Sequence, residues 1–174
     1  MVTILMLTLA LTSSSASEQR IPGMNRVRDN GDPIVARLLD EAREHSATFR
    51  RLLETINDTD GLVYVEQGTC GAGPRACLLM TMRVSGPYRV LIIHINIRRD
   101  HAQVIGSLGH ELHHAIEVLH ESGIRSAGQM FGFYARLAGD PTLQMDRRTF
   151  ETEAAIRAGD AVRAEFNASW RARP

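Results

Sequence analysis

The chain has 174 residues, which is enough for one domain with a hydrophobic core and too few for two domains of ordinary size. Its 20 acidic residues balance 20 basic ones, so no excess of charge favours nucleic acid or an anionic membrane surface as a partner. The function must therefore be sought in a local site.

The first 16 residues resemble a secretory signal peptide. An apolar stretch at residues 2–11 is followed by small residues, and Ser14 and Ala16 suit the two small positions of a cleavage site. The stretch is too short to span a membrane. We therefore expect an exported protein, periplasmic or secreted. The usual positive charge before the apolar stretch is missing, so a cytoplasmic protein that starts at Met24 is the alternative.

Two cysteines, Cys70 and Cys77, flank a glycine-rich segment that is flexible enough to bring them within disulfide distance. Export and a disulfide would support each other. The alternatives are two free thiols in a cytosolic loop, or a Cys77 that is simply packed in a strand. Their spacing matches no compact zinc knuckle.

The N-terminal half predicts a linker, a long helix and three strands. Residues 17–31 are expected to be the linker. Asp32 and Pro33 then supply an N-cap and a first-turn proline for an amphipathic helix that extends to Ile56, with Ser46 as the point where it could bend. The β-rich runs are residues 62–67, 76–84 and 88–97, and residues 85–87 form the turn of a hairpin between the last two.

The C-terminal half predicts three helices. Asp100 caps the first, which carries apolar residues on one face up to Leu119. A short helix is expected at residues 128–138, and a final one at 148–168. This order of elements predicts an α+β domain with a small, mainly antiparallel sheet.

The first of these helices contains the pattern HExxH, formed by His110, Glu111 and His114. Two histidines four residues apart project about 40° from each other around a helix, so both can bind one metal ion. The glutamate between them can accept a proton from water, which is the chemistry of a zinc hydrolase. The alternative is an ordinary amphipathic helix with these histidines on its solvent face.

Two neighbouring residues offer other readings of the motif. His113 could replace His114, but only His114 leaves a glutamate in the position of the base. Glu117 lies on the same face, and Glu111 with His114 reads as the ExxH of a carboxylate and histidine iron site. That site needs a second ExxH, which the sequence lacks. Glu117 is therefore interpreted as a partner of a histidine, or as solvated.

A catalytic zinc site needs a third protein ligand, and the final helix offers Glu151 and Glu153. In a helical projection Glu151 falls within a broad face of small apolar residues, whereas Glu153 falls on the charged face with Arg157. A carboxylate on a buried face needs a strong partner, and a metal ion supplies one. A buried salt bridge to an arginine is the alternative.

With these residues the sequence resembles the gluzincin group of zinc metallopeptidases, in particular its compact members. In that group HExxH is completed by a glutamate on a later helix, which here matches Glu151 in an ExxA segment. The resemblance covers about half of the chain, and its second motif is weak. It departs from the group at Ala155, where many members have an aspartate that orients a histidine ligand.

The resemblance implies a zincin-like domain at residues 32–174, in which the HExxH helix and a glutamate-bearing C-terminal helix pack with the sheet. It implies one zinc ion, a peptide or protein substrate, and pairing of that substrate with an edge strand at residues 88–97. Tyr134 is a candidate donor to the developing oxyanion, with core packing as its alternative. His94 and His120 are expected to be structural.

The sequence thus predicts a zinc-dependent peptidase with Glu111 as general base and His110, His114 and Glu151 as ligands. A non-catalytic zinc-binding or interaction domain of the same fold is the first alternative, and an interaction protein without metal is the second. Nothing in the sequence indicates the oligomeric state.

Overall fold

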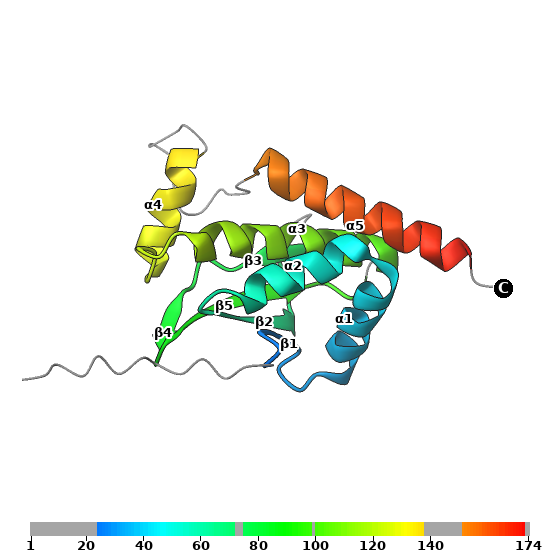
Figure 1. The fold of residues 1–174 in the computed structure, drawn as a ribbon, viewed down its shortest axis with the longest axis horizontal. Helices are drawn as coiled ribbons and strands as arrows, with labels where there is room; N and C mark the ends of the chain where they lie inside the picture. The colour runs from blue at the N-terminus through cyan, green and yellow to red at the C-terminus, as the bar shows by residue number, and fades with distance from the viewer. Residues whose placement is uncertain (1–23, 72–74, 99, 138–150, 173–174) are drawn as a thin grey trace, which may run out of the picture.

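Five helices and one mixed sheet make up the part of the chain that the computed structural model describes, which is residues 24–71, 75–98, 100–137 and 151–172 (Figure 1). The predicted α+β class is confirmed. The predicted signal peptide lies outside the described residues. The elements are β1 (Val27–Arg28), α1 (Pro33–His45), α2 (Ala47–Asn57), β2 (Gly61–Gln67), β3 (Ala76–Leu78), β4 (Arg83–Ser85), β5 (Tyr88–Ile95), α3 (His101–His120), α4 (Ala127–Leu137) and α5 (Glu153–Arg171).

The sheet is mixed, so the prediction of a mainly antiparallel sheet is wrong. Its order is β1-β2-β5-β3, and β4 also pairs with β5. β1 and β5 both run parallel to β2, whereas β3 and β4 run antiparallel to β5. The cause is the path of the chain. After β2 the chain forms β3, and the position of one strand remains open in the sheet between the two. The β4–β5 hairpin then turns the chain back, and β5 fills that place parallel to β2.

β5 is therefore an interior strand, and the expectation that residues 88–97 form the sheet edge is wrong. The predicted run at residues 76–84 is divided into β3 and β4, which pair with different parts of β5. The predicted hairpin turn is present, with Gly86 at a φ of 56° that favours glycine. The edge of the sheet beside the later helices belongs to β3.

The linker predicted at residues 17–31 extends too far, because β1 lies within this range. Val27 is buried and pairs with Val63 of β2, and the backbone N–H of Arg26 donates to the Asn57 side chain over 2.9 Å. A strand of two residues is too short for an alternating pattern to reveal it in the sequence.

Helices α1 and α2 replace the single long helix, and they meet at Ser46, the predicted bend. Asp32 caps α1 by accepting from Ile34 N over 2.9 Å, with Pro33 in the first turn. Ser46 follows α1 and caps α2, since its Oγ accepts from Phe49 N over 2.9 Å. Its Oγ also donates to Glu165 of α5, which ties this bend to the C-terminal helix.

Helix α3 is covered on two sides, which decides the environment of the site. Asp100 caps it as predicted, accepting from Gln103 N over 3.0 Å. Its apolar residues pack into the core, while α5 lies along the helix on another side (Figure 1). The two helices approach closely at glycines. A Cβ placed on Gly159 would lie 2.9 Å from the Gly106 carbonyl oxygen and 3.0 Å from His110 Cβ. The face with the motif is thus covered by α5.

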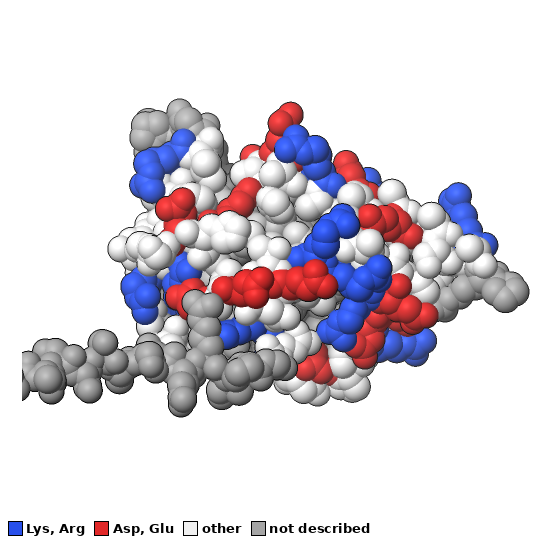
Figure 2. Space-filling model, viewed as in Figure 1, with Lys and Arg blue, Asp and Glu red and all other residues white. Residues whose placement is uncertain are grey.

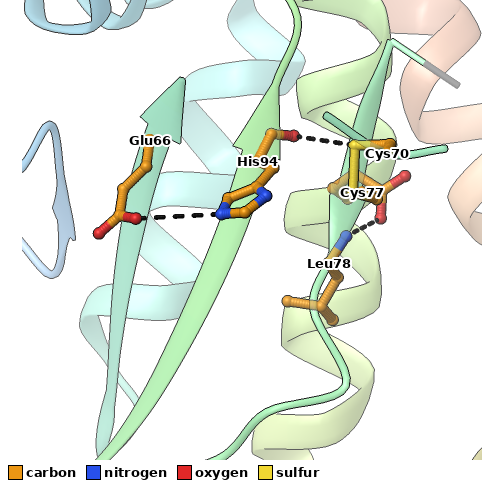
Figure 3. Close-up of a disulfide and its surroundings, with 6 residues drawn as sticks. Glu66, Cys70, Cys77, Leu78 and His94 are labelled. Atoms are coloured by element: carbon orange, nitrogen blue, oxygen red, sulfur yellow. Dashed lines mark hydrogen bonds and ion pairs between the residues drawn. A yellow bond between two sulfur atoms is a disulfide. The ribbon is translucent and has the colours of Figure 1, made fainter. Parts of the chain in front are cut away.

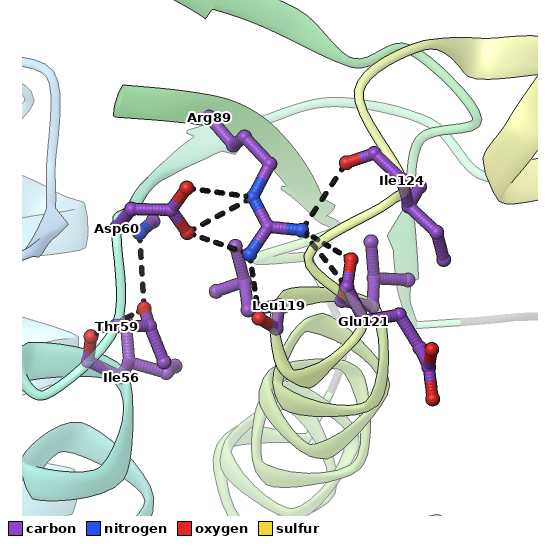
Figure 4. Close-up of polar contacts among 9 residues, drawn as sticks. Ile56, Thr59, Asp60, Arg89, Leu119, Glu121 and Ile124 are labelled. Atoms are coloured by element: carbon purple, nitrogen blue, oxygen red, sulfur yellow. Dashed lines mark hydrogen bonds and ion pairs between the residues drawn. The ribbon is translucent and has the colours of Figure 1, made fainter. Parts of the chain in front are cut away.

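Arg89, almost fully buried, joins the sheet to the end of α3 (Figure 4). Its guanidinium binds the Asp60 carboxylate through Nε and Nη2. The remaining N–H groups donate to four backbone carbonyls at and beyond the C-terminus of α3, those of Val118, Leu119, Glu121 and Ile124. A buried guanidinium requires such complete pairing, and the carbonyls at a helix end require donors.

Over the described part of the face shown in Figure 2, acidic and basic side chains are interspersed. Within the described ranges, no helix combines the length and the apolar character that a membrane span requires.

Candidate metal centre

Three side chains predicted as metal ligands meet between α3 and the start of α5. The Nε2 atoms of His110 and His114 are 3.0 Å apart, and Glu151 Oε2 lies 3.2 Å from His110 Nε2. One ligand atom from each residue lies within 4.8 Å of the others, so the three side chains could hold a metal ion together. The histidines come from successive turns of α3, and Glu151 directly precedes Thr152, the N-cap of α5.

The structure distinguishes the two candidate histidines. His113 lies outside the cluster and approaches Glu117 at 3.7 Å, whereas His114 is buried and faces His110. The preference for His114 agrees with this arrangement. Burial lowers the pKa of His110, and the nearby His114 lowers it further. The neutral form, which can bind metal, is thereby favoured.

Glu117 orients His114 from the side opposite the cluster. Glu117 Oε2 lies 2.8 Å from His114 Nδ1, and the carboxylate can only accept, so the proton of a neutral His114 is on Nδ1. Nε2 then presents its lone pair to His110 and Glu151. Thr152 Oγ1 donates to the other Glu117 oxygen over 2.6 Å. Partial burial would raise the pKa of Glu117, but these two hydrogen bonds hold it below its ordinary value. Glu117 is thus the partner of a histidine, as one of its two interpretations from the sequence had it.

Glu111 is anchored to the sheet edge. Its Oε2 accepts the backbone N–H of Leu78 over 2.8 Å. Leu79 N donates to Ile92 O and Asn96 N to Arg75 O, so in this alternating ladder Leu78 N–H points away from β5, toward α3. Burial raises the pKa of Glu111 to about 7, although the charge of His114 and the Leu78 N–H both lower it. A carboxylate with such a pKa suits proton transfer near neutral pH. No sequence pattern indicated the Leu78 contact, because it involves backbone.

Glu151 lies in the cluster as predicted, but it does not belong to the final helix. α5 begins at Glu153, so Glu151 lies before the helix, and the helical projection that placed it on a buried face does not apply. Its side chain is 47% exposed. Glu153 points away and pairs with Arg157 over 3.0 Å. The physical reason is that Thr152 caps the helix by accepting from Ala155 N.

Tyr134 of α4 is buried, and its hydroxyl donates to the His114 carbonyl over 2.8 Å. Its ring stands edge-on to the His114 ring at 5.5 Å. The phenol proton is thus used within the protein. Tyr134 thus packs against His114, and it also lines the cavity beside the cluster, so its role as an oxyanion donor stays a prediction.

The three candidate ligands and Glu111 line a cavity of about 400 Å³. Residues of β3 form one wall of the cavity, and residues of α5 form another. Residues of α3 complete the lining. The volume lies within the usual range for ligand sites.

Cys70 and Cys77 form a disulfide on the β3 side of this cavity, as the sequence analysis proposed (Figure 3). Cys77 belongs to β3 and precedes Leu78, the residue that holds Glu111. Cys70 Sγ also approaches the His94 carbonyl at 3.7 Å. The disulfide therefore ties the segment after β2 to the strand that positions Glu111.

No family model, curated protein or solved structure matches the chain. The geometry of this centre therefore carries the case for function.

Proposed function

We propose that the protein is a zinc-dependent hydrolase of the peptidase type. The observation that carries the proposal is the convergence of His110, His114 and Glu151 beside Glu111 in one cavity. Two imidazoles and a carboxylate are a known ligand set for catalytic zinc. Tetrahedral ligands about 2.0–2.1 Å from zinc lie about 3.3 Å from one another. The separations of 3.0 and 3.2 Å at His110 are close to this value.

Each residue has a separate role in the proposed reaction. Bound zinc supplies Lewis-acid chemistry, since it polarises a carbonyl and lowers the pKa of water. His110, His114 and Glu151 hold the ion, and Glu117 keeps the His114 lone pair directed toward it. Glu111 takes a proton from water and returns it to the leaving amine.

The edge of β3 is the proposed position of the substrate backbone. Glu111 already accepts the Leu78 N–H, and the rest of this edge adjoins the cavity, where an extended peptide can pair with a strand. This assignment replaces the edge that was predicted from the sequence at residues 88–97.

Metal content and turnover of one variant test the proposal. The purified protein should contain one zinc ion per chain and cleave members of a broad peptide library. Glu111→Gln should retain the zinc and lose hydrolysis, because it removes only the base. Zinc retention with full turnover in this variant would refute the mechanism.

A zinc-binding domain without activity is the second candidate. It is favoured by the hydrogen bond from Leu78 N–H, which holds the Glu111 carboxylate at the sheet edge. Stoichiometric zinc without cleavage of any peptide would select this candidate.

Export remains part of the proposal, and the disulfide supports it because such bonds persist in oxidising compartments. Mature protein from its native host should begin near Ser17. An intact Met1 in a cytosolic fraction would exclude export.

A further inference from the structure

Within the described part of the chain, one charged residue in the lining of the cavity has neither a partner nor a role in the proposed chemistry. Arg163 and Asp160 on the α5 wall pair over 2.6 Å, and Arg163 also approaches the Gln103 amide at 3.4 Å. Glu111, Glu151 and the histidines belong to the proposed metal and base chemistry. On the β3 wall, Arg75 is exposed, and its guanidinium has no hydrogen-bond or ion-pair partner among the described residues.

The backbone of Arg75 is fixed although its side chain is unpaired. Its carbonyl accepts from Asn96 N over 2.7 Å, which extends the β3–β5 ladder to this residue. Cys77, two residues later, is bonded to Cys70. The backbone that carries the guanidinium is therefore fixed, and it lies at the wall where we propose that the substrate binds. The planar guanidinium can bind a carboxylate there through two hydrogen bonds.

We propose that Arg75 binds a carboxylate of the substrate, so that the site prefers peptides with an acidic residue or a free C-terminus near the cleaved bond. This inference rests on the proposed function and names its substrate class. An aspartate or glutamate side chain and a terminal carboxylate present the same chemistry to the guanidinium, and the experiment separates them.

The test uses the full-length, zinc-loaded protein and two matched sets of peptides. One set exchanges Glu for Gln beside the cleaved bond, and the other exchanges a C-terminal acid for an amide. The wild type should show a higher kcat/KM for the carboxylate member of at least one set, by about tenfold, as expected for a charged hydrogen bond. The set that shows the preference identifies the source of the carboxylate.

Arg75→Gln should remove that preference, and Arg75→Lys should retain part of it because the charge is kept. Arg83→Gln is the matched control, since Arg83 is an exposed arginine of β4 outside the cavity lining. It should leave the preference unchanged. The preference should also weaken with added salt, because the guanidinium is exposed. A preference that persists in Arg75→Gln, or a wild type that treats both members of each set alike, overturns the inference.

Binding of the same peptides to the zinc-loaded protein separates this inference from the proposed function. If nothing is cleaved, the hydrolase proposal fails. Calorimetric binding that depends on the carboxylate and is lost in Arg75→Gln would still support the role of Arg75. Binding that is equal for acid and neutral peptides, or absent for all of them, would overturn it.

Discussion

Glu117 accepts the Nδ1 proton of His114 over 2.8 Å, and this contact fixes which nitrogen of His114 faces His110 in the candidate metal site. Contacts of this kind typically contribute 10- to 100-fold to metal affinity. Glu117→Ala should therefore weaken zinc binding by about this factor, measured by competition with a fluorescent chelator. Glu121→Ala is the control, since it lies at the C-cap of the same helix and its side chain is exposed. Equal zinc affinity in both variants would refute the orienting role.

Glu151→Gln and Glu153→Gln should separate a metal ligand from a surface charge. Loss of Glu151 removes a ligand, so the variant should release zinc to a mild chelator. It should also lose the gain in Tm that zinc gives the wild type, because a ligand that binds only the folded state stabilises it. Glu153 is 89% exposed in its side chain, so its variant should match the wild type within about 0.5 kcal/mol. The reverse pattern would assign the ligand to Glu153.

Arg89→Met should be among the most destabilising single changes in the chain. It leaves Asp60 unpaired and removes the donors from the carbonyls at the end of α3. Breaking a buried pair by removing one partner costs about 3–5 kcal/mol, measured as the free energy of unfolding in urea. Arg83→Met, at an exposed site, should cost at most about 0.5 kcal/mol. A cost below about 1 kcal/mol for Arg89→Met would contradict this account.

Glu165 should make stability depend on pH in the acid range. Partial burial alone would raise its pKa, but hydrogen bonds from Ser46, the Thr48 N–H and the Thr48 hydroxyl lower it. A lowered folded-state pKa stabilises the protein above the unfolded-state value of about 4.3 and ceases to do so as the pH falls through the folded-state value.

Glu165→Gln should therefore reduce stability at pH 7 by about 1 kcal/mol, the usual contribution of a helix cap. The difference from the wild type should shrink below pH 4, measured as urea midpoints from pH 7 to pH 3. Glu54→Gln is the control, because Glu54 is exposed on the same helix that Glu165 caps. A difference that stays constant with pH would exclude the ionised carboxylate as its cause.

The sequence predicted those parts of the site that depend on short-range geometry. His110 and His114 are one helical turn apart, so any helix that includes both brings them together. The caps at Asp32 and Asp100 were predicted for the same reason, since their side chains bind backbone within three residues. The disulfide is also local, because it closes a loop between residues seven apart.

Contacts between distant segments escaped prediction. The Leu78 contact to Glu111 joins a backbone group to a side chain 33 residues away, and a pattern of side chains cannot reveal it. β5 lies between β2 and β3 in the sheet. The alternation of apolar residues along a strand does not determine its position in the sheet. Glu151 was predicted to reach the cluster from a buried face of the final helix. It lies before that helix instead, because Thr152 caps the helix.

The close crossing of α3 and α5 makes the candidate metal ligands sensitive to the volume of a residue outside their set. Gly159 lies where a single methyl group would collide with the Gly106 carbonyl and with His110 Cβ. The approach of α5 to the turn of α3 that carries His110 thus depends on the absence of a side chain at Gly159. Alanine at Gly159 should push α5, the helix that follows Glu151, away from His110, and so change the spacing of the proposed ligands without changing any donor atom.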